Sequence, residues 1–122
     1  MLNKLKAWDK KRKRIKFYLK DRNKNNLYRL VIYRSNTNIY AQLVNDEKHI
    51  TVLSTSSIDK DLEKTISTAK SKVDKSEIVG NEIAKKMKKA KIESIIFDRN
   101  GYKYHGRIKA LGEAVRKSGI NF

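Results

Sequence analysis

Charge is the feature that most restricts how this chain can fold. Its 122 residues carry 30 Lys and Arg against 13 Asp and Glu, a formal net charge of +17 at pH 7. A compact body with this excess repels itself, so we expect it to work beside a polyanion. Residues 1–24 hold eleven basic and two acidic residues, and so about half of the net charge. The hydrophobic core must therefore come from residues 25–122, behind a basic N-terminal arm.

The arm, residues 1–24, is predicted to be helical with one thin apolar stripe. It has no Gly or Pro between residues 4 and 22, and Leu5, Trp8, Ile15 and Leu19 recur at near-helical spacings. Arg12 continues the same side of the helix. This stripe is too thin to hold a helix on a core by itself. We therefore expect an arm that is frayed or disordered when free and ordered on a partner.

The densest charge of the arm is the run Lys10, Lys11, Arg12, Lys13 and Arg14. A charged run is most often a solvated tail. Here the aromatic residues Trp8, Phe17 and Tyr18 are interleaved with the cations, which favours an arm that binds nucleic-acid phosphates.

Residues 25–122 are predicted to form a single α/β domain, and their hydrophobic residues suffice for one small core. Apolar runs predict strands over residues 27–34, 39–44 and 50–53, joined by short turns into an antiparallel meander. Leu62, Ile66, Ala69 and Val73 share one helical stripe, with Ser57 and Asp59 as candidate caps. A second helix over residues 78–90, a buried strand at 95–97 and a helix over 108–115 follow. This order predicts a mixed sheet, in which the late strand is parallel to a neighbour, with helices packed on it.

Residues 97–107 are the segment densest in chemistry. Two glycines allow a close backbone approach, among cations, tyrosines and a histidine: Arg99, Tyr102, Tyr104, His105 and Arg107. Cations meet phosphates and aromatic planes stack on unpaired bases, so this composition suits RNA. The alternative is a tight structural loop, in which Tyr102 and Tyr104 cover the edge of the core and Asp98 pairs with Arg99 or caps a turn.

Two further polar segments are candidate contacts. The turn at residues 34–38 contributes Arg34, Ser35 and Asn36, and the next strand places Tyr40 and Gln42 on one face. Ser54 and Thr55 follow a strand. An ordinary polar turn is the usual explanation of the first segment, and a turn that binds the RNA backbone is the alternative. The hydroxyl residues 54–57 either contact phosphates or cap the next helix, and capping is the expected role for Ser57.

Several classes of function have little support. The chain has no cysteine, which excludes disulfides and thiolate chemistry. His49 and His105 have no second histidine at metal-ligand spacing, and the carboxylates are scattered, so we expect no metal and no catalytic residues. No apolar run is long enough to span a membrane, and the charged N-terminus does not resemble a secretory signal.

Residues 34–42 and 97–111 resemble the two signatures of the L-eighteen family of bacterial large-subunit ribosomal proteins. The C-terminal residues 119–122 resemble the usual ending of that family, and the resemblance runs the whole length of the chain. It implies an α/β body, no catalytic role, no cofactor and no small-molecule substrate. It also implies a cytoplasmic location on the large ribosomal subunit.

The resemblance further implies partners. The family binds 5S ribosomal RNA in the central protuberance, beside the other 5S-binding ribosomal proteins, and also meets the large ribosomal RNA. By this resemblance the arm follows RNA phosphates, and the two signatures provide the contacts of the body. A general RNA-binding protein or an RNA-processing factor outside the ribosome is the alternative, and a cationic protein that binds membrane surfaces is a weaker one, because the apolar face of the arm is thin.

Overall fold

A four-stranded mixed sheet organises residues 25–122. The computed structural model describes residues 2–23 and 25–122, so Met1 and Lys24, at the two ends of the predicted arm, lie outside the described residues. The strands are β1 (Tyr28–Arg34), β2 (Ile39–Asn45), β3 (Ile50–Ser56) and β4 (Ile95–Asp98), in the order β3-β2-β1-β4. The first three pair antiparallel and β4 pairs parallel to β1, which confirms the predicted mixed sheet.

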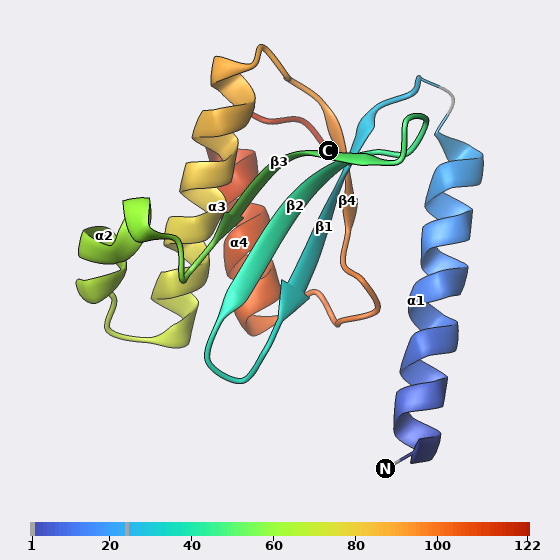
Figure 1. The fold of residues 1–122 in the computed structure, drawn as a ribbon, viewed down its shortest axis with the longest axis horizontal. Helices are drawn as coiled ribbons and strands as arrows, with labels where there is room; N and C mark the ends of the chain where they lie inside the picture. The colour runs from blue at the N-terminus through green and yellow to red at the C-terminus, as the bar shows by residue number, and fades with distance from the viewer. Residues whose placement is uncertain (1, 24) are drawn as a thin grey trace.

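Two long helices, α3 (Lys72–Lys89) and α4 (Gly106–Lys117), cover one face of this sheet (Figure 1). Ile32 of β1, Ile83 of α3 and Leu111 of α4 are fully buried in the layer between them. The two helices approach closely at Gly80, where an added Cβ would lie 2.6 Å from the carbonyl oxygen of Leu111. The predicted strands, the helices predicted over residues 78–90 and 108–115, and a core within residues 25–122 are therefore confirmed.

The opposite face of the sheet carries no such helix layer. Strand alternation places Val31 and Tyr33 of β1 on this open face, and the register pairs them with Gln42 and Tyr40 of β2. Tyr33 is 49% exposed, whereas its neighbour Ile32, on the other face, is fully buried. The sheet therefore presents a polar and aromatic surface on the side away from its core.

The predicted helical stripe from Leu62 to Val73 is wrong. The segment forms a short 3₁₀ turn, η1 (Lys60–Leu62), then α2 (Glu63–Ser67), and Val73 belongs to α3. The hydroxyl groups of Ser67 and Thr68 donate to the carbonyls of Lys64 and Thr65, 2.6 Å away in both cases, and end α2. Ser71 then caps the new helix by accepting from the Asp74 amide at 3.2 Å.

The serine-rich segment also differs from the prediction. Strand β3 continues to Ser56, three residues beyond the predicted end at residue 53. Ser57 does not cap a helix, because its hydroxyl accepts from the Ile39 amide at 3.1 Å and donates to the Asn38 side chain at 2.9 Å. The hydroxyl therefore ties the end of β3 to the start of β2.

Residues Leu2–Arg22 form α1, which stands beside the open face of the sheet, near the β4 edge (Figure 1). Its predicted stripe is present in the described side chains: Trp8, Arg12, Ile15 and Leu19 are half-buried, and the side chain of Leu5 lies outside the described residues. Whether the helix is frayed without a partner stays a prediction. Among the described helices, none has the length and hydropathy required to cross a bilayer.

Candidate nucleic-acid interface

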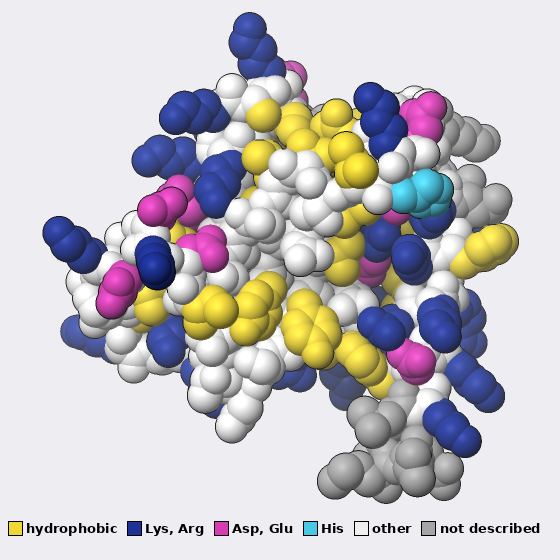
Figure 2. All heavy atoms as spheres, in the orientation of Figure 1, with side chains coloured by type: hydrophobic (Ala, Val, Ile, Leu, Met, Phe, Trp, Pro, Cys, Tyr) yellow, Lys and Arg dark blue, Asp and Glu magenta, His cyan; other side chains and the backbone are white. Residues whose placement is uncertain are grey.

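A cleft with a volume of about 710 Å³ separates α1 from the open face of the sheet. One wall is cationic and consists of Arg12, Lys13 and Lys16 of α1. The other wall belongs to the sheet and its loops, and includes Ser35, Val31, Tyr33, Tyr40, Gln42, Val44 and Asn100. Figure 2 shows the same division, with Lys and Arg side chains gathered along α1 next to hydrophobic and aromatic side chains over the strands. The arm and the body therefore line one site together.

A stack of four side chains joins α1 to the body. The Trp8 ring lies 5.5 Å from the Tyr102 ring between centroids. The Arg12 guanidinium carbon lies over the Trp8 ring, 4.9 Å from its centroid, and that of Arg34 lies 4.9 Å from the Tyr102 centroid. We call Arg12, Trp8, Tyr102 and Arg34 the aromatic ladder. It connects α1, the loop after β4 and the end of β1, and each step is a favourable contact.

Gly101 makes room for this ladder. Its φ is +84°, a conformation that side chains rarely adopt, and an added Cβ would lie 3.0 Å from Trp8 Nε1. The loop therefore depends on glycine here for its backbone conformation and for the close approach of the indole.

A second hollow, of about 630 Å³, lies on the other side of the ladder. Five cationic residues line it, each from a different part of the fold, and no carboxylate does: Lys11, Arg34, Lys72, Lys103 and Arg107. Burial and the neighbouring charge of Arg34 lower the pKa of Arg107, which shows how closely positive charge is packed here. Nearby, Arg107 donates to the Ser35 carbonyl at 2.8 Å, and this contact holds the guanidinium in place. Uncompensated cations held in a concave surface form a site for anions such as phosphates.

The floor of the cleft is electrically balanced. Arg29, 4% exposed, donates to Asp98 and to both oxygens of Asp46, the latter at 2.9 and 3.0 Å. Burial opposes its charge, but the hydrogen bonds and charges of the two carboxylates outweigh that effect and raise the pKa of Arg29. For Asp46, burial likewise opposes ionisation, and Arg29 nevertheless lowers its pKa. The positive charge available to a ligand therefore lies on the walls and not on the floor.

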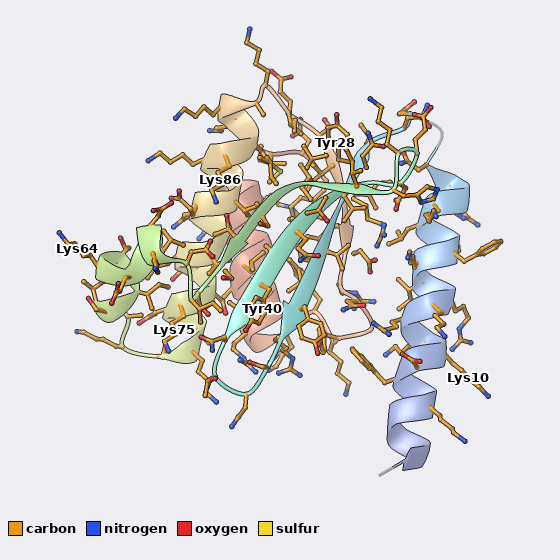
Figure 3. All side chains as sticks on the ribbon, viewed as in Figure 1. Lys10, Tyr28, Tyr40, Lys64, Lys75 and Lys86 are labelled. Atoms are coloured by element: carbon orange, nitrogen blue, oxygen red, sulfur yellow. The ribbon has the colours of Figure 1, made fainter. Side chains whose placement is uncertain are left out.

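The structure brings most of the predicted contact residues to these two hollows. The cleft includes the predicted residues Arg12, Lys13, Ser35, Tyr40 and Gln42, and the cationic hollow includes Lys11, Arg34, Tyr102, His105 and Arg107. In Figure 3, Tyr40 lies over the open face of the sheet and Lys10 points away from it. Lys10 and Arg14 line neither hollow.

The other predicted residues lie apart. Arg99 and Ser54 are exposed outside both hollows, and Asn36 accepts from Lys72 at 3.2 Å at the rim. Thr55 is 2% exposed and faces the helix layer, so its hydroxyl is not presented to a ligand. Tyr104 follows the structural alternative, as its hydroxyl donates to Glu113 at 2.9 Å and its ring packs edge-on against Phe97.

The structural alternative considered for the segment 97–107 is observed in it. Tyr102 and Tyr104 pack on the edge of the core, as the structural alternative predicts. Asp98 accepts from the Asn100 amide at 2.8 Å and so caps the turn, while its ion pair is with Arg29 and not with Arg99. The loop is therefore built by one set of side chains and presents another to solvent.

The polar and aromatic residues of these surfaces that sequence reasoning missed include Lys16, Tyr33, Lys72, Asn100 and Lys103. Strand alternation offered a signal for Tyr33, because the register places it opposite Tyr40. Lys103 lies inside the second signature. No local pattern distinguishes Lys72 from the other lysines, since its position depends on where α3 begins. Within the described ranges, no three potential metal-ligating side chains gather.

Comparison with known proteins shows the family to which this chain is similar. The family model for ribosomal L18 of archaea, bacteria, mitochondria and chloroplasts matches residues 2–122. A large ribosomal subunit protein uL18 from Staphylococcus epidermidis is 51% identical over 94 residues, which are 77% of this chain and 76% of that protein. The uL18 protein of Bartonella henselae is 47% identical over 97 residues, 80% of each chain. That of Bartonella quintana is 44% identical over 111 residues, 91% of this chain and 88% of the relative.

The family model spans both hollows and the arm, and together with the relatives it confirms the resemblance to the family. They also confirm the expected location on the large ribosomal subunit. The chain belongs to the ribosomal L18 family and is a structural protein of the large ribosomal subunit.

Proposed function

We propose that this protein binds 5S ribosomal RNA and helps to attach it to the large ribosomal RNA in the central protuberance, beside the other 5S-binding ribosomal proteins. It does so as a structural RNA-binding protein, without a catalytic step or a cofactor. The observation that carries this proposal is the pair of hollows on either side of the aromatic ladder, in which cations of the arm and of the body converge.

Electrostatic attraction provides the first part of the binding. The net charge of +17 draws the protein to RNA, and each phosphate contact releases counterions, so affinity falls as salt rises. Lys10, Lys13 and Arg14 suit this role, because they are exposed along α1. Such contacts hold any RNA and do not distinguish one sequence from another.

The cationic hollow provides the second part, which is recognition of shape. Arg34 and Arg107 are held by Tyr102 and by the Ser35 carbonyl, so their guanidinium groups keep a fixed spacing. Folded RNA whose phosphates match this spacing gains several charge-assisted hydrogen bonds at once, whereas other RNAs gain fewer. The arm therefore increases affinity for every RNA, and the hollow selects among them.

Binding to 5S ribosomal RNA and to a folded control RNA of the same length, measured across a salt series, tests this proposal. We expect the protein to bind 5S ribosomal RNA at salt concentrations that abolish its binding to the control RNA. Arg107→Ala should weaken 5S binding about tenfold and the control much less, because it removes a charge-assisted contact. Equal and equally salt-sensitive binding to both RNAs would contradict the proposal.

Lys64→Ala is the matched control variant. It also removes one positive charge, but from α2, at the end of the molecule away from α1 (Figure 3). It should leave the ratio of 5S to control affinity unchanged. If both variants reduced binding to both RNAs by the same small factor, only net charge would matter, and the cationic hollow would have no part in selection.

A further inference from the structure

The cleft between α1 and the sheet differs in chemistry from the cationic hollow. The hollow is lined by cations on several sides, whereas the cleft has one cationic wall and one wall of aromatic, amide and hydroxyl groups. A ligand that fills the cleft must therefore be negative on one side and carry flat, hydrogen-bonding groups on the other. A nucleotide has this division, with its phosphate at one end and its base at the other.

We propose that this cleft holds an unpaired segment of RNA, with its bases against Tyr33 and Tyr40 and its phosphates against α1. The inference rests on the proposed function, since it names the part of the RNA that the same surface takes. The volume of about 710 Å³ is within the range of sites that enclose a small organic ligand.

The two tyrosines leave their ring faces available. Tyr33 and Tyr40 are opposite each other across β1 and β2, with centroids 6.1 Å apart and planes tilted by 55°. Tilted rings do not cover each other, and Tyr33 is 49% exposed. Bases stack on such faces only when they are unpaired, because those of a duplex are already stacked on their neighbours.

A polar group beside the rings suits the edges of bases. Gln42 follows Tyr40 on the same face of β2 and is exposed, whereas Asn100, which also lines the cleft, is only 9% exposed. An amide offers both a donor and an acceptor, so it can pair with the edge of a base. In a duplex these edges are occupied by the partner strand or lie in a groove that side chains do not reach.

The cations of the opposite wall can change partners. Asp9 accepts from Arg12 at 2.7 Å and lies 3.7 Å from Lys13, but both ion pairs are solvent-exposed. Exposed pairs of this kind contribute little free energy, so a phosphate can replace the carboxylate. Among the ion pairs of the described residues, none involves Lys16.

The test uses two fluorescent probes: an unstructured seven-nucleotide RNA of mixed A and U, and a duplex of the same sequence. Their binding to the full-length protein is followed by anisotropy at moderate salt. We expect the single strand to bind more tightly than the duplex. In the double variant Tyr33→Ala/Tyr40→Ala, the affinity for the single strand should fall about tenfold or more, whereas the affinity for the duplex should change little.

Ile58→Ala is the control, because Ile58 is 61% exposed, lies outside α1 and lines neither hollow. It should change neither affinity. Circular dichroism establishes that each variant is folded. Equal affinities of the protein for the single strand and the duplex would overturn the inference, and so would equal losses of affinity for both in the double variant. Displacement of the single strand by poly-glutamate as readily as by unlabelled single strand would also overturn it, because charge alone would then explain binding.

The same variants separate this inference from the proposed function. If the double variant keeps full affinity for 5S ribosomal RNA, the cleft does not hold unpaired bases, although the protein still binds 5S RNA. If the unmodified protein does not prefer 5S RNA over the folded control, the proposed function itself fails. We expect the double variant to bind 5S RNA about tenfold more weakly than the unmodified protein does.

Discussion

The arm and the body of this protein are held in place by different means. In the body, strands and helices bury a shared core that includes Ile32, Ile83 and Leu111. Helix α1 contributes no member of that core, and its described aromatic contact with the body is Trp8 on Tyr102. A single change can therefore displace the arm while the body stays folded, whereas the body tolerates few changes in its interior.

This difference assigns separate tasks to the two regions. The body fixes the positions of Arg34, Arg107 and the two tyrosines of the cleft. The arm adds positive charge, and the aromatic ladder holds the cationic side chains of α1 in a fixed position relative to the sheet. An arm that was only a charged tail would raise the affinity for every RNA alike, but an anchored arm also contributes to the recognition of RNA shape.

The largest expected effect is on the body. Arg29→Ala leaves the buried carboxylate of Asp98 and the half-buried carboxylate of Asp46 without their partner, and we expect the free energy of unfolding to fall by about 3–5 kcal/mol. Chemical denaturation at pH 7 measures this loss. Arg29 lowers the pKa of Asp46, so the contribution of that pair is complete above about pH 4 and is lost as the pH falls further. The gap between variant and parent should therefore narrow in acid, and a gap independent of pH would contradict this explanation.

The next effect separates the arm from the body. Trp8→Ala removes one side of the aromatic ladder but no residue of the core, so the unfolding free energy should change by less than about 1 kcal/mol. The preference for 5S RNA over the folded control should nevertheless fall about tenfold, because the cations of α1 lose their fixed direction. Phe17→Ala is the control on the same helix, since Phe17 is 73% exposed. An equal effect of the two variants on 5S binding would show that the ladder has no role in selection.

Two glycines allow a finer test of the ladder. Gly101 and Gly106 both have positive φ, so Ala at either position is strained by about 1 kcal/mol. Only the Cβ at residue 101 would meet Trp8, at 3.0 Å, whereas nothing lies within 4 Å at residue 106. Both variants should lose similar stability, and only Gly101→Ala should shift Trp8 emission towards that of exposed tryptophan. A similar shift in both would mean that backbone strain, and not contact, controls docking.

The smallest effect concerns Tyr104, which stabilises the loop without lining either hollow. Tyr104→Phe removes its hydrogen bond to Glu113 and should cost about 1 kcal/mol. Burial and Glu113 raise the pKa of Tyr104 to about 12. The hydrogen bond therefore contributes fully below about pH 10, the ordinary pKa of tyrosine, and its contribution is lost as the pH rises from there to about 12. Across this alkaline range, the thermal stability of the parent should fall more steeply with pH than that of Tyr104→Phe. Parallel plots of stability against pH would show that this hydrogen bond does not contribute.

The sequence predicted the body well because its periodic apolar residues mark both strands and helices. It failed between residues 57 and 73, where the hydroxyl groups of Ser67 and Thr68 bind backbone carbonyls and interrupt an apolar stripe that would otherwise continue. Side-chain capping of this kind competes with apolar periodicity, and composition does not show which one prevails.

The candidate site was predicted as separate segments, and the structure adds how they meet. Residues 34–42 and 97–107 were found from their composition, but the register that sets Tyr33 beside Tyr40 and the contact of Trp8 with Tyr102 depend on tertiary structure. From the thin stripe of α1, the sequence predicts an arm that is frayed or disordered when free. The space above Gly101, which receives Trp8, gives a physical reason to propose the opposite.

The most direct test of this account is the fluorescence of Trp8 in the protein without RNA, because Trp8 is the only tryptophan of the chain. Acrylamide is the suitable quencher, since it is neutral and is not attracted by the net charge. We expect Trp8 to be shielded from acrylamide and to emit at short wavelength, and we expect Tyr102→Ala to make it as accessible as free tryptophan. If Trp8 of the unmodified protein is already as accessible as free tryptophan, the arm is not anchored before it meets RNA, and the ladder does not join the two regions.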